Sequence, residues 1–231
     1  MDRVNYHQAF FLDGKPTKDY DGISYSLKTK LRDKGFDLEQ DGAFAFMPND
    51  APPQVPRLNM QGNDGNIKVV ISLVRADLYI DYSEMSKEFT MEEAVEISLI
   101  FKEALENVGV NIEYAGMVIT YAKFRKNPVG DIKTGLLNAN NTVFDKELSS
   151  IAVKTRSFFP FMDNNEGLNI ILNIESAVEK KSRKSVLMIK KDINNLKIKK
   201  LTSEADFQRF MEICVQENND DVINSVLNFG G

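Results

Sequence analysis

The sequence predicts an α+β protein in which antiparallel β meanders are covered by helices. Three observations support this fold class: strand-like stretches outnumber helical ones, turn signals separate consecutive strands, and a meander runs into an amphipathic helix twice. The 231 residues are 42% hydrophobic and 27% charged, which suits one large α+β domain or two small ones. We expect two similar halves, an N-terminal α+β half at residues 1–126 and a C-terminal α+β half at 127–231, with one continuous domain as the alternative.

The first half begins with a strand and a helix. Residues 4–12 are aromatic and branched and end at a turn signal, Asp13-Gly14. A helix is expected over residues 19–34, where Ile23, Leu27 and Leu31 recur every four positions. A short strand at residues 43–46 should then lead into a rigid connector, since four of the seven prolines lie between residues 48 and 56.

A meander and a capped helix complete this half. Strands are predicted at residues 58–60, 67–74 and 78–83, and the glycines of Gly62-Asn63-Asp64-Gly65 mark the first hairpin. In the third strand, Leu78, Ile80 and Tyr82 should face one side, with Tyr79 and Asp81 on the other. The helix should run from the capping box of Thr90 and Glu93 to Gly109.

A long strand is predicted at residues 112–124 and leads to the boundary between the two halves. The second half then repeats the plan of the first, with a short helix within 129–139 and strands at 151–159, 168–178 and 185–193. Thr202 or Ser203 should cap the last helix. Its apolar stripe consists of Phe207, Phe210, Met211, Cys214 and Val215.

The most unusual feature is a basic segment in an acidic chain. The whole chain carries a net charge of −5, yet residues 179–200 hold nine cations against Glu179 and Asp192. Three interpretations stay open: lysines that protect an edge strand, a contact for an acidic protein partner, and a contact for nucleic acid. This segment contains no aromatic residue and one arginine. The candidate contact residues are Lys180, Lys181, Arg183, Lys184, Lys190, Lys191, Lys197, Lys199 and Lys200.

Catalytic and metal-binding patterns are sparse. The one histidine, His7, lies within the first strand and is expected to be a partly buried, hydrogen-bonded strand residue, and the one cysteine, Cys214, is expected in the core. Asp77, Asp81 and Glu84 come closest to a carboxylate cluster, although exposed strand carboxylates are the preferred interpretation. We assign no catalytic residue, no metal and no cofactor, and the glycine pairs lack the pattern of a phosphate-binding loop.

Several stretches together resemble a known group of proteins. They are "DAPPQVPR", "RADLYIDYS", "TMEEAVEISLIFKEALENVG", "IEYAGMVITY", "LNIILNIES" and "LTSEADFQRFMEICVQENNDDVINSVL". In their order they resemble a sporadically distributed family of uncharacterised bacterial proteins. The resemblance implies carriage on mobile elements, sometimes near phage-defence genes, and it implies no reaction.

We therefore expect a non-catalytic interaction or accessory protein acting with a partner protein in such a system. The alternative is a nucleic-acid-associated protein using the basic segment, and a distant third is a hydrolase of unknown type. The N-terminus lacks a signal-peptide pattern, and no stretch of the sequence has the length and apolar character of a membrane span. We therefore expect a cytoplasmic protein without membrane contact. Gly230-Gly231 is interpreted as a frayed tail.

Overall fold

The computed structural model describes residues 2–15, 19–40, 51–62, 64–82, 90–137, 148–160, 167–179, 182–196 and 200–227. The strands are β1 (Asp2–Leu12), β2 (Leu38–Gln40), β3 (Leu58–Gly62), β4 (Ile67–Ile71), β5 (Arg75–Asp81), β6 (Ile112–Phe124), β7 (Ala152–Pro160), β8 (Gly167–Val178) and β9 (Ser185–Asn194). The helices are α1 (Tyr20–Arg32), α2 (Met91–Glu106), α3 (Pro128–Gly135), α4 (Glu204–Glu217) and α5 (Asp220–Leu227).

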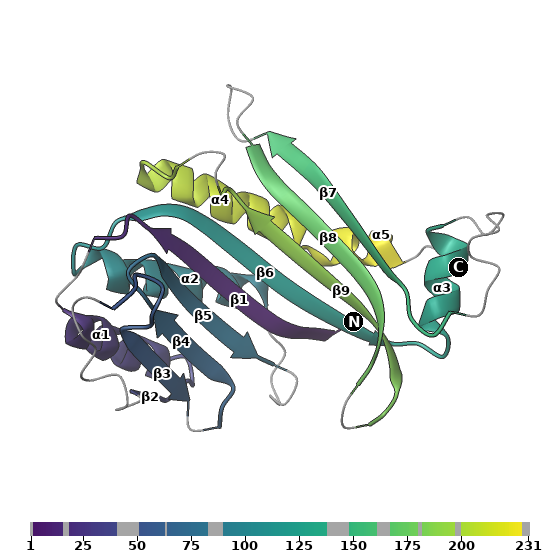
Figure 1. The fold of residues 1–231 in the computed structure, drawn as a ribbon, viewed down its shortest axis with the longest axis horizontal. Coiled ribbons are helices and arrows are strands. Elements are labelled where there is room, and N and C mark those ends of the chain that lie inside the picture. The colour runs from purple at the N-terminus through teal and green to yellow at the C-terminus, as the bar shows by residue number, and fades with distance from the viewer. Residues whose placement is uncertain are drawn as a thin grey trace.

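Within the described residues, the nine strands belong to one sheet in the order β2-β3-β4-β5-β1-β6-β9-β8-β7 (Figure 1). Every neighbouring pair is antiparallel. The predicted α+β class, with antiparallel meanders covered by helices, is therefore confirmed.

The order of elements repeats about the centre of the sheet. Along the chain, β1 is followed by α1, a meander ending in β5, and α2; β6 is followed by α3, a meander ending in β9, and α4. In the sheet, β1 and β6 lie side by side, β5 and β9 flank them, and β4 and β8 come next. The fold thus has two halves of similar topology that share a continuous sheet, and the second round of elements begins with β6.

Local capping explains where the major helices begin. The Asp19 carboxylate accepts a hydrogen bond from the Gly22 amide at 2.7 Å at the start of α1. Thr90 and Glu93 form the predicted capping box of α2, and Ser203 forms another with Asp206 at the start of α4. These side chains satisfy amide groups that would otherwise lack partners in the first turn.

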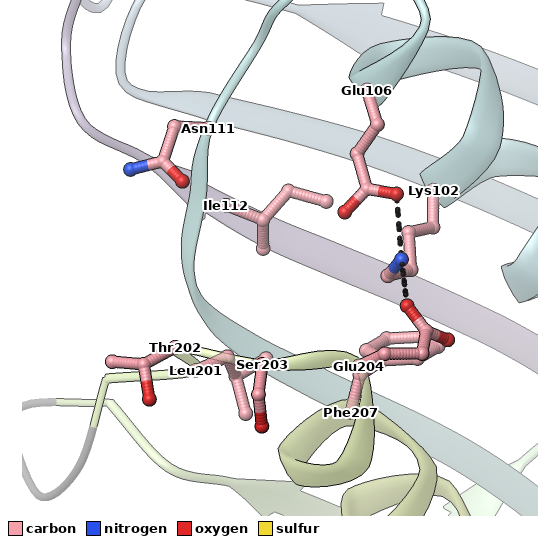
Figure 2. A pocket seen from close by; sticks show the side chains of 9 residues that line it. All are labelled: Lys102, Glu106, Asn111, Ile112, Leu201, Thr202, Ser203, Glu204 and Phe207. Atoms are coloured by element: carbon pink, nitrogen blue, oxygen red, sulfur yellow. Dashed lines mark hydrogen bonds and ion pairs between the residues drawn. The ribbon is translucent and has the colours of Figure 1, made fainter.

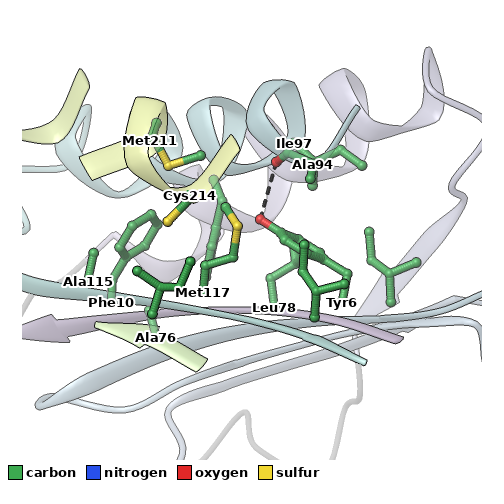
Figure 3. Close-up of a cluster of buried hydrophobic side chains, with 14 of the residues drawn as sticks. Tyr6, Phe10, Ala76, Leu78, Ala94, Ile97, Ala115, Met117, Met211 and Cys214 are labelled. Carbon is green, nitrogen blue, oxygen red and sulfur yellow. Dashed lines mark hydrogen bonds between the residues drawn. The ribbon is translucent and has the colours of Figure 1, made fainter. Parts of the chain in front are cut away.

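The core lies between one face of the sheet and helices α1, α2 and α4 (Figure 3). Tyr6 and Phe10 of β1 point toward the helices, and the Tyr6 hydroxyl donates to the Ala94 carbonyl of α2 at 3.2 Å. Cys214 of α4 is completely buried in the same layer, and burial raises the pKa of its thiol well above the usual range. The predicted core position of Cys214 is confirmed.

The opposite side of the sheet, which we call the second face, carries the alternate residues of each strand. In β5, Leu78, Ile80 and the following Tyr82 are buried against the helices, whereas Tyr79 and Asp81 are exposed on the second face. This alternation confirms the predicted register of the strand. Because β6 pairs with both β1 and β9, the same parity extends across the two halves.

Two expectations about the C-terminal half are corrected. The helix predicted after Ser203 is present as α4, but it is not the last one: α5 follows it as a separate helix, because the Asn218 side chain donates to the Cys214 carbonyl at 2.9 Å and the Asn219 carboxamide oxygen accepts from the Val222 amide at 2.8 Å. The interpretation of the lysines of β9 as protection of an edge strand is wrong, since β9 lies between β6 and β8.

Some predictions fall outside the described residues. They are the short strand at 43–46, the carboxylate of Glu84 and the pair Gly230-Gly231. Among the described helices, none combines the length and apolar character needed to cross a membrane.

Candidate functional site

Strand pairing joins two basic stretches that lie far apart in the sequence, at residues 123–126 and 183–184. Phe124, the last residue of β6, is paired with Val186 near the start of β9, and the Arg125 amide donates to the Ser185 carbonyl at 3.2 Å. The end of β6 therefore lies beside the chain that enters β9 (Figure 1). We call this surface the basic end, and it consists of Phe124, Arg125, Lys126, Arg183 and Lys184.

The chain entering β9 is held in a defined turn. The Arg183 amide donates to the Glu179 carbonyl at 2.9 Å, and the Glu179 amide donates to the Lys184 carbonyl at 2.9 Å. Arg183 has a φ of 57°, a left-handed conformation that costs a residue with a side chain about 1–2 kcal/mol. The Ser182 hydroxyl also accepts from the Lys184 amide at 3.2 Å. These bonds hold Arg183 and Lys184 in exposed positions at the basic end.

The end of β6 is fixed by the start of α3. The Asn127 side chain accepts from the Gly130 amide at 3.0 Å and Pro128 occupies the first turn, so the strand stops and the chain changes direction. Lys126 is exposed at this corner. Arg125 lies 3.7 Å from the Asp131 carboxylate, which is longer than a good hydrogen bond.

Charge and aromatic character meet at the basic end. Its four cations, Arg125, Lys126, Arg183 and Lys184, lie near two carboxylates, Glu179 and Asp131, which leaves a surplus of two positive charges in this set. The Phe124 side chain is 56% exposed, and the Lys184 Nζ lies 5.4 Å from the centre of its ring. Phe124, Arg125, Lys126, Lys184 and Ser185 line a shallow hollow. The arrangement is suited to binding an anionic group next to an apolar ring.

The nine predicted contact residues fall into separate groups. Arg183 and Lys184 belong to the basic end, and Lys190 is exposed on the second face. Lys200 is paired with the Glu113 carboxylate, and this hydrogen bond raises the pKa of its ammonium group. Lys180, Lys181, Lys197 and Lys199 lie outside the described residues.

The prediction of Lys191 as a surface contact residue is wrong. It is 4% exposed, faces the helices, and its Nζ lies 2.7 Å from the Glu217 Oε2 in α4. Successive residues of a strand point to opposite faces, so Lys190 and Lys191 could not both reach a partner on one side. Lys191 therefore stabilises the packing of α4 on the sheet.

Conversely, sequence reasoning missed Phe124, Arg125 and Lys126. The signal for them was the short basic and aromatic stretch "KFRK" at residues 123–126, immediately before Asn127-Pro128. Its importance depends on the pairing of β6 with β9, which joins it to Arg183 and Lys184. The aromatic residue that the basic segment lacks is therefore supplied by another strand.

His7 and Asp77 form a separate polar cluster on the second face. The His7 Nε2 lies 2.7 Å from the Asp77 Oδ1, and the Arg75 Nε donates to the same oxygen at 2.8 Å. The His7 ring stacks on Tyr79 with 4.1 Å between the ring centres. His7 is thus a partly buried, hydrogen-bonded strand residue, as predicted. Among the described residues, no group of three histidine, cysteine or acidic side chains is placed to hold a metal ion.

A second pocket lies on the helical side, between the end of α2, the start of β6 and the start of α4 (Figure 2). The Lys102 Nζ lies 2.6 Å from Glu106 and 2.7 Å from Glu204, and it sits 5.2 Å from the centre of the Phe207 ring. Desolvation acts to lower the pKa of Lys102, but the hydrogen bonds to both carboxylates outweigh it and the pKa is raised. The pair of Lys102 with Glu204 links α2 to α4, so we interpret the pocket as structural.

The comparisons with known proteins are limited. No protein-family model matches the chain, and no curated protein matches it. Among solved structures, the chain is similar to "Methanococcus jannaschii TBP", with 14% identity over 97% of this chain and 98% of that chain, at a TM-score of 0.29. A similarity of that size supports no statement about function. The class that the fold and the site define is therefore an α+β protein with one continuous antiparallel sheet and a cationic surface at the end of two central strands.

Proposed function

We propose that the protein is a non-catalytic binding component and that its basic end binds the phosphate backbone of nucleic acid. The observation that carries this proposal is the convergence of four cations, two after the end of β6 and two before the start of β9, on one surface of an acidic chain. Lysine and arginine side chains that neutralise phosphates release condensed counterions, and this release drives sequence-independent binding. From the sequence, an accessory role with a protein partner is the first expectation and nucleic-acid binding is the alternative, and the cations of the basic end favour the alternative.

An acidic protein is the competing partner for the same cations. The composition of the site favours nucleic acid, since an exposed phenyl ring among the cations adds a surface that a carboxylate-rich partner does not need. The net charge of −5 also restricts attraction of any polyanion to local patches such as this one.

The test is charge reversal at the basic end. Fluorescence anisotropy of labelled single-stranded and duplex oligonucleotides, recorded at low salt, should show binding by the wild type. The variant R183E/K184E should bind at least about tenfold more weakly, because both side chains are exposed and lie in the site.

The matched control is K28E/K68E, which makes the same change in net charge elsewhere. Lys28 lies on α1, and Lys68 lies on β4, three strands from β6. The affinity of K28E/K68E for the oligonucleotides should stay within about twofold of that of the wild type. Equal losses in both variants would refute a local site. Salt-sensitive binding to poly-glutamate without binding to any oligonucleotide would overturn the nucleic-acid proposal in favour of an acidic protein partner.

A further inference from the structure

Phe124 is an exposed aromatic residue that lies away from the hydrophobic core. It is the last residue of β6 and is 56% exposed, and it shares the parity of Thr120 and Ala122, which places its side chain on the second face. The buried apolar side chains in this part of β6, Met117, Ile119 and Tyr121, have the opposite parity. The packing of the core therefore gives no reason for a large aromatic side chain at this position.

The surroundings of the ring are cationic. Lys184 Nζ is 5.4 Å from the ring centre, and Arg125, Lys126 and Ser185 line the hollow beside it. A cation above an exposed ring contributes only about 0.5–1 kcal/mol, so an exposed lysine can leave the ring for a stronger anionic partner. When Lys184 binds a phosphate, one face of the ring becomes available to a planar group attached to that phosphate.

We infer that the basic end binds single-stranded nucleic acid, with one unpaired base stacked on the Phe124 ring and adjacent phosphates held by Lys184, Arg183 and Lys126. The inference rests on the proposed function and names the form of nucleic acid that the site prefers. In a duplex, the faces of the bases are already stacked on one another and are closed to a side chain. A single strand exposes these faces, and stacking on an aromatic side chain tolerates any base.

The chain has no tryptophan, which makes a direct optical test possible. Phe124→Trp introduces a sole indole at the site, and stacking of a base should quench its fluorescence. The matched control is Phe158→Trp on β7, which is 54% exposed and shares the second face but lies three strands from β6. The titrants are a single-stranded oligothymidine, a duplex of the same length, and heparin as a polyanion without bases.

We expect the single strand to reduce the fluorescence of Phe124→Trp by about half or more, and to leave that of Phe158→Trp unchanged. Heparin should bind without comparable quenching, because it carries charge and no base. By anisotropy, Phe124→Ala and Phe124→Leu should both bind the single strand about 5- to 150-fold more weakly than the wild type, with duplex affinity within about twofold. The leucine variant keeps an apolar side chain, so its loss would show that the flat ring is required.

The outcomes separate this inference from the proposed function. If neither form of oligonucleotide binds the wild type, the proposed function fails and the inference fails with it. If R183E/K184E weakens binding while Phe124→Ala binds the single strand as tightly as the wild type, the proposed function holds and the stacking role is refuted. Equal quenching of Phe124→Trp and Phe158→Trp would also refute it. Because Phe124 is exposed, the circular dichroism and melting temperature of its variants should match the wild type within a few degrees.

Discussion

Replacing Lys191 with methionine should destabilise the protein, whereas the same change at Lys190 should not. Lys191 is 4% exposed and its Nζ lies 2.7 Å from Glu217 Oε2, while Lys190 is exposed on the other side of the same strand. The two variants change adjacent residues to the same side chain. A difference in stability between them therefore reports on which face of β9 each side chain occupies.

The magnitude follows from the environment of Glu217. Removing one partner of a buried ion pair usually costs about 3–5 kcal/mol, because the remaining charge is left without compensation. The Glu217 side chain is 20% exposed, so water can solvate part of its charge, and methionine replaces the apolar stem of the lysine. We expect a loss of about 3 kcal/mol for K191M, which corresponds to about 6–12 °C in melting temperature for a chain of this size.

Thermal and urea unfolding followed by circular dichroism would measure the effect. K190M should unfold within about 1 °C of the wild type, as is usual for an exposed position. The double variant K191M/E217M should regain part of the loss, because it removes the unpaired carboxylate as well. Equal melting temperatures for K190M and K191M would refute the assignment of Lys191 to the helical side.

Two further predictions concern buried titratable groups. Burial raises the pKa of the Cys214 thiol, so folded protein at pH 8 should react with a thiol reagent only as fast as it unfolds; rapid labelling without denaturant would contradict its position in the core. Burial also raises the pKa of Tyr121 to about 12 and raises those of Tyr6 and Tyr82. An unfolded tyrosine loses its proton near pH 10, so the stability present below pH 10 should fall as the pH rises toward 12. Absorbance at 295 nm would show these phenols ionising only on unfolding, and ionisation of all seven tyrosines near pH 10 in folded protein would contradict the prediction.

Much of the fold follows from local patterns in the sequence. The capping box of Thr90 and Glu93 and the alternation of Leu78 and Ile80 with Tyr79 act over a few residues, and the structure contains both as expected. The division between α4 and α5 is also local, but its signal is weak. Asn218 and Asn219 are compatible with a continuing helix, and it is the bond between the Tyr121 hydroxyl and the Asn218 side chain, at 3.0 Å, that helps to fix the break.

The candidate site was harder to predict because it depends on strand order. The pairing of Phe124 with Val186 connects residues distant in the chain, and no local pattern places β9 rather than β7 beside β6. Without that pairing, the basic segment has no aromatic residue, and the stretch at 123–126 is too short to stand out. The adjacent pair Lys190-Lys191 illustrates a second limit, since only the register of β9 determines which side chain is exposed.

The salt dependence of binding to single-stranded oligothymidine tests the central claim most directly. A single-stranded ligand should lose about 0.7 in log affinity per log unit of salt for each phosphate contacted, so full use of the four cations of the basic end gives a slope of about −2.8. Removing two of the cations in R183A/K184A should make the slope shallower by about 1.4. A wild-type slope near zero, or an identical slope in the variant, would contradict the claim that the basic end binds the phosphate backbone.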